Sequence, residues 1–463
     1  MKRIIFFIIF WWVSFPSWAQ ESQILSFEEY LAYVKRYHPL VKKADLLLSE
    51  SEALLLKSRG AFDPNLAIDY AKKEFKQTDY FDKLNATFNI PTWYGIGFNG
   101  NLEQFSGDFL NRESTLPDGG LYSAGVSISL AKDLLINQRI ATLKQAKLYK
   151  EQAFADNQWL VNNILYEASL SYFNWIKTYQ QREVFSTYLV NADERLQNII
   201  SSFQAGDRPA IDTTEARIIV NTRQLELEKS RLDYIKATLD LSNYLWIDNI
   251  PLELSSLARP DVNTLNFVDL VLQIQSDTTD VDLLSHPQIV STQLKLRSLI
   301  VEKQLNKNSL LPVIDLKYNF LTEQPETFSN FTTNNYKAGL AFSLPIFLRK
   351  ERADLKLTKY KIQATDFELN TIKLRIKNTI SRIQQEVIYN QRQIDVASGI
   401  VRDYTTLLRA EERKFSLGES AVFLINSRES NLIKSKLKVI QLENELLNTK
   451  GRYFRALGTS LSR

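Results

Sequence analysis

The chain has 463 residues, with 57 Lys and Arg against 53 Asp and Glu, 44% hydrophobic residues and no Cys. A net charge of +4 over this length does not supply the dense basic patch that phosphate backbones require, which excludes nucleic acid as a partner. The absence of Cys excludes disulfides, thiolate metal sites, iron–sulfur clusters and a thiol nucleophile.

Residues 1–19 have the pattern of a secretory signal peptide. Lys2 and Arg3 precede an apolar run over residues 4–13, and Ser17-Trp18-Ala19 places small residues where signal peptidase reads them. The run is well short of the roughly 20 residues that span a bilayer as a helix. We therefore predict cleavage after Ala19 and an exported chain. Because charge interrupts every later apolar run, a part of this chain within a membrane must consist of strands in a closed barrel.

The rest of the chain is an internal duplication. His38-Pro39 recurs as His286-Pro287 at an offset of 248 residues (286 − 38), and the same offset places Pro64 on Pro312. In both copies the pattern predicts a helix of about thirty residues that ends before this second proline, followed by an alternating strand.

Two further matches follow at shorter offsets. Residues 122–130 match 336–344, with apolar residues at alternate positions, and Phe203-Gln-Ala-Gly206 matches Phe415-Ser-Leu-Gly418. The offset falls from 248 to 214 (336 − 122), so the first copy carries about 34 additional residues between its strands, within residues 71–121. Residues 81–91 and 94–103 of this insertion fit either an additional hairpin or a long loop.

Long helices occupy most of the remainder. Residues 136–203 and 350–415 contain no proline, and each stretch as a helix would reach roughly 100 Å. Apolar residues recur every seven positions in three series, which predicts coiled-coil packing: Ile380, Val387, Ile394, Val401, Leu408 and Phe415; Ile425, Leu432, Val439, Leu446 and Tyr453; and Ile211, Ile218, Leu225, Leu232, Leu239 and Trp246.

Each copy thus reads helix, strand, strand, long helix, tight turn, helix. We predict a first repeat over residues 20–249, with strands within about 64–130 and a hairpin tip at about 204–211. A connector over residues 250–284 follows. The second repeat covers residues 285–463, with strands at about 312–322 and 335–347 and a tip at about 416–422. The strands of one chain are too few to close a barrel, so other copies must complete it.

This duplicated plan, the strand-to-helix junction over residues 343–353 and the two F-x-x-G turns resemble the TolC family of outer-membrane channel proteins over essentially the whole mature chain. The resemblance implies an α+β membrane protein in which three copies pool four strands each into a twelve-stranded β-barrel. Their helices would continue as a coiled-coil tunnel across the periplasm, to meet a periplasmic adaptor and an inner-membrane pump. It implies a passive outer-membrane exit duct for efflux or type I secretion.

The resemblance also assigns roles to the tips. Phe203, Gly206, Phe415 and Gly418 would form the hairpin tips and the adaptor contact. Acidic residues six and nine positions after the second glycine form selectivity rings in some members, but Leu424 and Ser427 stand there. Asp212 and Glu215 hold the equivalent places in the first copy. Three copies would gather six carboxylates at one periplasmic aperture and favour cations. Alternatively, the two carboxylates cap the helix that follows the tip.

Two other functions fit parts of this pattern. A periplasmic adaptor also carries a long helical hairpin, but typically one hairpin beside small β-rich domains; a coiled-coil scaffold without a channel is the third reading. No cluster of nucleophile, base and metal ligands is present in the sequence, so we predict neither an enzyme nor a cofactor. Both histidines occupy equivalent places in the repeats, which favours a helix-shaping role over a metal site.

Overall fold

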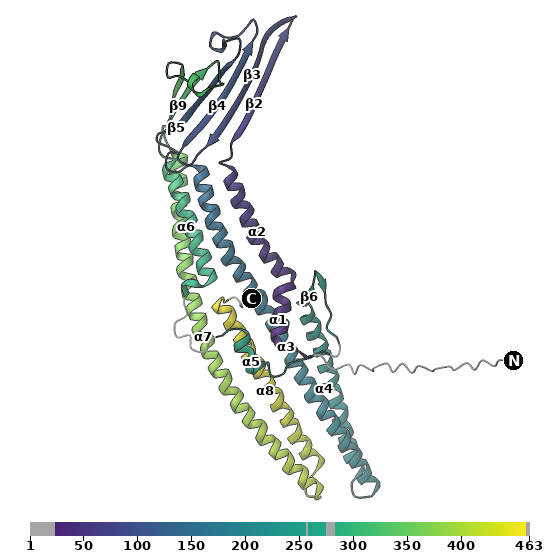
Figure 1. Cartoon of the computed structure of the whole chain (residues 1–463). Helices are drawn as coiled ribbons and strands as arrows, with labels where there is room; N and C mark the ends of the chain where they lie inside the picture. The colour runs from purple at the N-terminus through teal and green to yellow at the C-terminus, as the bar shows by residue number, and fades with distance from the viewer. Residues whose placement is uncertain (1–23, 256–257, 275–282, 460–463) are drawn as a thin grey trace, which may run out of the picture. The chain divides into compact units, whose positions relative to one another are not determined.

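The computed structural model of the chain describes residues 24–255, 258–274 and 283–459, so the predicted signal peptide lies outside the described residues (Figure 1). The chain divides into two compact units. The sheet unit contains residues 37–167, 272–389 and the helical end after residue 448, and the hairpin unit contains residues up to 36, 168–271 and 390–448. The α+β class predicted from the sequence is confirmed.

The sheet unit is built on six antiparallel strands in the order β10-β9-β5-β4-β3-β2. The strands are β2 (Asn65–Phe75), β3 (Thr78–Pro91), β4 (Ile96–Ser106), β5 (Leu121–Ser129), β9 (Val313–Thr322) and β10 (Tyr336–Ser343). The insertion of the first copy is therefore an additional hairpin, β3–β4. The prediction that the last strand extends to residue 347 is wrong, because Pro345 cannot donate to a strand ladder.

Four helical segments of the sheet unit continue from its strands (Figure 1). They are α2 (Pro39–Gly60), α6 (Pro287–Asn308) and the nearer parts of two long helices, α3 (Gln138–Gln204) and α7 (Arg349–Ser416). α2 and α6 have 22 residues each rather than about thirty. Their start is set by Pro39 and Pro287, which lack an N–H and suit the first position of a helix.

The two histidines cap these shorter helices. His38 Nδ1 accepts a hydrogen bond from the backbone N–H of Leu40 at 3.3 Å, and His286 Nδ1 accepts one from Gln288 at 3.2 Å. Both residues are buried. An accepting Nδ1 requires an unprotonated nitrogen, and burial lowers the pKa of His286 from 6.5 to about 4. The helix-shaping interpretation of the His-Pro pairs is confirmed.

The cap at His286 should make stability depend on pH. Between pH 6.5 and about pH 4 the unfolded chain binds a proton at this imidazole that the folded chain does not. The free energy of unfolding should therefore fall by roughly 3 kcal/mol as the pH drops through this range. His286→Asn retains a capping oxygen without a titrating ring, so thermal unfolding followed by circular dichroism should show a shallower pH dependence. An equal dependence in both proteins would assign the effect to carboxylates elsewhere.

The hairpin unit consists of two helical hairpins with a small accessory region. The farther part of α3 pairs with α4 (Ala210–Ser242), and the farther part of α7 pairs with α8 (Val422–Leu457). The accessory elements are α1 (Phe27–Tyr37), α5 (Thr264–Val271) and the parallel pair β1 (Ile24–Leu25) and β8 (Arg259–Pro260), together with the pair β6 (Trp246–Ile247) and β7 (Ile250–Pro251).

Aromatic side chains hold the accessory region on the hairpin unit. Tyr172 of α3 is fully buried, and its ring lies 5.2 Å from that of Phe27 and 5.3 Å from that of Tyr30, centroid to centroid. The Tyr172 hydroxyl donates to the carbonyl of Leu25 at 2.6 Å and accepts from the N–H of Asp261 at 3.3 Å. The Tyr172 hydroxyl therefore bonds to β1 and to the residue that follows β8.

The three predicted heptad series differ in how far their apolar residues are buried. In α7 and α8 the series is buried where it meets other helices, as at Leu408, Ile425 and Leu432. In α4 the series is exposed, and its five helical members are 52–72% accessible. We call this the α4 stripe: Ile211, Ile218, Leu225, Leu232 and Leu239. The face of α4 that packs inward instead carries Ala216, Leu227 and Leu241.

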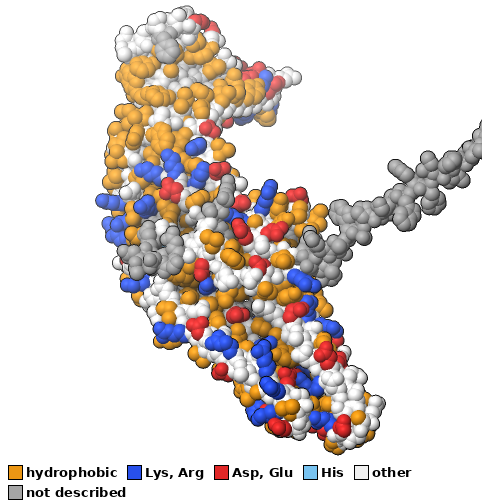
Figure 2. Space-filling view, turned by 60° about the horizontal axis from the view of Figure 1, so that its bottom comes forward, with side chains coloured by type: hydrophobic (Ala, Val, Ile, Leu, Met, Phe, Trp, Pro, Cys, Tyr) orange, Lys and Arg blue, Asp and Glu red, His pale blue; other side chains and the backbone are white. Residues whose placement is uncertain are grey.

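Hydrophobic side chains are also exposed over the sheet, where they form a broad band (Figure 2). None of the helices among the described residues is long and apolar enough to cross a membrane.

Candidate functional site: hairpin tips and a buried ionic cluster

The first tip joins α3 to α4 through a glycine in the left-handed region. Gly206 has a φ of +82°, which favours glycine because a side chain there crowds the backbone. The Gly206 N–H donates to the carbonyl of Phe203 at 3.0 Å, and the Asp207 N–H donates to that of Ser202 at 2.9 Å. These two bonds are the Schellman arrangement that ends helices.

The second tip repeats this geometry between α7 and α8. Gly418 has a φ of +79°, its N–H donates to Phe415 at 3.1 Å, and the Glu419 N–H donates to Lys414 at 2.9 Å. A Cβ at either glycine would meet open space, so backbone conformation alone accounts for the residue type. The repeated F-x-x-G pattern thus encodes the same turn twice.

Arg208 connects the two tips. Its guanidinium lies 4.0 Å from the centre of the Phe415 ring, a cation–π distance, and 3.4 Å from Asp212 Oδ2. Phe415 is half-buried and packs with the apolar residues of both hairpins, including Leu196 and Val422. The corresponding Phe203 remains 43% exposed. The tips are therefore similar in backbone and different in surface.

Asp212 and Glu215 lie in the first turns of α4, and both are half-buried. The N-cap position of α4 is Pro209, which offers no side-chain cap. Asp212 is the third residue of the helix, where its charge is favourable to the helix dipole, and it pairs with Arg208 rather than with an N–H at the cap. The roles of both residues at an aperture stay predictions.

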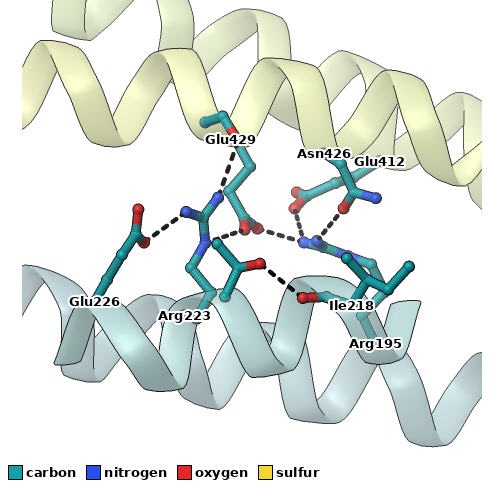
Figure 3. Close-up of polar contacts among 9 residues, drawn as sticks. Arg195, Ile218, Arg223, Glu226, Glu412, Asn426 and Glu429 are labelled. Atoms are coloured by element: carbon teal, nitrogen blue, oxygen red, sulfur yellow. Dashed lines mark hydrogen bonds and ion pairs between the residues drawn. The ribbon is translucent and has the colours of Figure 1, made fainter. Parts of the chain in front are cut away.

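A buried ionic cluster joins the hairpins behind the tips (Figure 3). Glu429 of α8 lies between two arginines: its Oε2 is 2.6 Å from Arg195 Nη2 of α3, and its Oε1 is 3.6 Å from Arg223 Nε of α4. The Glu429 side chain is 1% exposed and that of Arg223 is 6% exposed. One carboxylate thus ties α8 to both helices of the other hairpin.

Further hydrogen bonds and an ion pair extend the cluster. Arg223 Nη1 donates to Glu226 at 2.8 Å and its Nη2 to Ser430 at 3.0 Å. Arg195 Nη1 donates to Asn426 at 3.3 Å, and Glu412 of α7 lies 3.9 Å from Arg195. The two positive charges face three carboxylates, which offsets the cost of burying them. The cluster therefore fixes how the hairpins pack while leaving no buried charge without a counter-ion.

Sequence reasoning missed this cluster, although a signal was present. Ile425 and Leu432 are buried members of one heptad series, and Glu429 falls between them on the same helical face, where a coiled coil normally has an apolar residue. A charged residue at such a position demands a partner. The sequence does not say that the partners are Arg195 and Arg223, more than 200 residues away.

Comparison with known proteins agrees with this architecture. Residues 281–459 match the family model of outer membrane efflux proteins. No curated protein sequence matches the chain. Among solved structures, the Campylobacter jejuni CmeC outer membrane channel has a TM-score of 0.63 at 13% identity, over 93% of this chain and 85% of that one. The Vibrio cholerae outer membrane protein VceC has a TM-score of 0.65 at 12% identity, over 94% and 97%. The Neisseria gonorrhoeae MtrE outer membrane channel has a TM-score of 0.66 at 13% identity, over 94% and 90%.

The fold is thus that of an outer-membrane channel subunit. The second repeat has the sequence pattern of the outer membrane efflux protein family. The predictions of the family, of an exit duct of an efflux system, and of a location in the outer membrane extending into the periplasm are confirmed. The family consists of channels rather than enzymes. The adaptor and scaffold alternatives are not favoured.

Proposed function

We propose that three copies of the chain form a passive duct that accepts solutes from a periplasmic adaptor and an inner-membrane pump and releases them outside the cell. The observation that carries the proposal is the exposed apolar surface of a single chain. The α4 stripe presents five large side chains in one row, and soluble monomers rarely expose such contiguous apolar patches. A second copy of the chain would cover it.

A similar row of side chains lies on α7. Its members are exposed and lie at multiples of seven residues from one another: Tyr360, Phe367, Leu374 and Ile388. This spacing is typical of a face that packs against another helix. In a ring, each chain has a neighbour on both sides, so two exposed helical faces per chain are the expected number.

The sheet supports the same arrangement. Its edge strands β2 and β10 are exposed along their whole length. Exposed edges with apolar residues such as Ile68 and Leu340 would aggregate unless another strand covers them. Pairing of β10 with β2 of the next copy removes every edge, which a sheet within lipid requires.

The adaptor contact belongs at the tips. Phe203, Leu417 and Phe423 are exposed there, beside the turns at Gly206 and Gly418. Exposed apolar residues at the end of a helical hairpin suit a partner that is itself a helical hairpin. Nothing in the tips specifies the solute, which we expect the pump to select.

We further propose that Asp212 and Glu215 of the three copies line the periplasmic aperture. The double change Asp212→Asn and Glu215→Gln should then reduce cation over anion selectivity, because six carboxylates are removed from the constriction. Reversal potentials of single channels in a salt gradient measure this. The single change Asp240→Asn, at an exposed position near the other end of α4, serves as the control. Unchanged selectivity in the double variant would mean that the two carboxylates only stabilise the N-terminal end of α4, through the helix dipole.

The function itself is tested with the mature protein purified in detergent. The detergent-corrected mass should be that of a trimer, and the same sample should form discrete channels in planar lipid bilayers. A monomer that needs no detergent and conducts no current would contradict the proposed duct. It would favour a coiled-coil scaffold without a channel.

A further inference from the structure

The first repeat contributes four strands to the sheet, and the second contributes two. The additional hairpin consists of β3 and β4, with 14 and 11 residues. It lies between β2 and β5 within the sheet rather than beyond an edge. β2 and β5 are the counterparts of β9 and β10, which are direct neighbours. The insertion has therefore separated two strands that the duplication would place side by side.

The inserted strands carry the same two faces as the others. Directly paired residues share a face, and the register pairs Phe88 with Gly100, Ile90 with Phe98, and Phe98 with Val126. Following the register across the sheet places apolar residues on one face of all six strands: Leu66, Ile68, Tyr70, Leu84, Phe88, Ile90, Ile96, Phe98, Val126, Ile128, Leu316, Phe320, Leu340 and Phe342. The hydrophobic band in Figure 2 lies over this sheet.

The opposite face is polar across the same strands. Its members in the inserted hairpin are Lys83, Asn85, Thr87, Asn89, Asn99, Asn101 and Glu103. Thr87 donates to Asn101 at 2.8 Å, and Asn99 of β4 donates to Asn319 of β9 at 2.8 Å, across the intervening β5. At that crossing β5 has Gly125, whose lack of a side chain leaves room for Asn319. The inserted hairpin is thus bonded into one continuous polar surface.

These properties indicate that the β3–β4 hairpin is part of the barrel wall. They do not fit a hairpin that plugs the lumen or lies outside the sheet. A strand that spans the outer membrane needs about 9–11 residues and alternates between lipid and lumen, and β3 and β4 meet both conditions. A hairpin folded into the lumen would not carry an apolar face in register with its neighbours.

The strand number also suits closure. Five successive antiparallel pairings separate β2 from β10, so these two edge strands run in opposite directions. β10 of one copy can therefore pair with β2 of the next without breaking the antiparallel alternation. An odd number of inserted strands would have forced a parallel pair at each junction.

We propose that each subunit contributes six strands and that the closed sheet of the trimer has eighteen, in place of the twelve that the family resemblance implies. This inference rests on the proposed trimeric duct. Barrel diameter grows roughly linearly with strand number, so the outer mouth is about half as wide again as with twelve strands. A sheet of this size leaves an open aqueous lumen. Size selection then falls to the helical tips.

The absence of Cys allows a direct test on the intact trimer. Single cysteines replace Phe88 and Asn85 on the two faces of β3, and Phe320 and Lys317 on the two faces of β9 serve as matched controls. Each variant is spin-labelled and reconstituted in phosphatidylethanolamine and phosphatidylglycerol vesicles. We expect labels at Phe88 and Phe320 to be relaxed mainly by oxygen, and labels at Asn85 and Lys317 by a water-soluble nickel complex.

The outcomes separate this inference from the proposed function. If β9 shows the contrast while both β3 labels are reached by nickel, the trimeric duct stands and the eighteen-stranded wall is wrong. If the mass is not that of a trimer and β9 shows no contrast either, both proposals fail.

A deletion variant gives a second measurement. Removing residues 76–106 joins β2 to β5 through residues 107–120 and leaves four strands per subunit. Polymers of graded size, added on the sheet side of single channels, should then be excluded at a smaller size than in the full chain. An unchanged cut-off would overturn the inference; if the deletion variant does not fold, the labels decide.

Discussion

Replacing Glu429 with glutamine should lower the free energy of unfolding by about 3–5 kcal/mol, because the substitution leaves Arg195 and Arg223 buried without their shared counter-ion. The side chain is 1% exposed and lies 2.6 Å from Arg195, so water cannot replace it. Urea unfolding followed by the helical circular dichroism signal measures the loss. Because the cluster ties α8 to both helices of the other hairpin, we also expect the variant to show a larger or less stable single-channel current.

Glu412 provides the matched control. It belongs to the same cluster but is 48% exposed at the side chain and 3.9 Å from Arg195, so Glu412→Gln should cost less than about 1 kcal/mol. Replacing Arg195, Arg223 and Glu429 together with apolar residues of similar volume should restore most of the stability. An equal loss of unfolding free energy in the Glu429 and Glu412 variants would show that the burial of Glu429 with its arginines is unimportant for stability.

Substituting two residues of the α4 stripe should abolish the trimer. Leu225 and Leu232 are 72% and 52% exposed in the single chain, so Leu225→Glu with Leu232→Glu leaves the fold of the subunit intact. In a trimeric ring, each substitution would remove roughly 1.5–3 kcal/mol of favourable apolar burial from every interface between subunits. The added carboxylates would also be desolvated there. Light scattering with detergent correction should report monomers.

The control for this change is Gln224→Glu, which adds one carboxylate, against two in the double variant, at an exposed neighbouring position outside the stripe. It should remain trimeric. Retention of the trimer by the double glutamate variant would mean that the stripe faces something other than a second copy, and the adaptor would then be the partner to test.

Local sequence was enough for the parts of the structure that depend on local chemistry. The two turns were predicted at Gly206 and Gly418 because a left-handed residue at a helix end favours glycine wherever it occurs. The long helices α3 and α7 follow from the absence of proline and from the apolar spacing. The duplication itself, visible in the His-Pro pairs and the paired strands, predicted the fold class and the family.

Features that depend on which surfaces meet required the tertiary structure. Heptad spacing shows that a helix has an apolar face, but it does not say whether that face meets the same chain, as at Leu408, or remains open, as at Leu225. The insertion in residues 71–121 fitted a hairpin or a loop equally well, and only strand pairing places it inside the sheet. The partners of Glu429 come from another hairpin, because charge pairing at such separation is decided by packing and not by neighbouring residues.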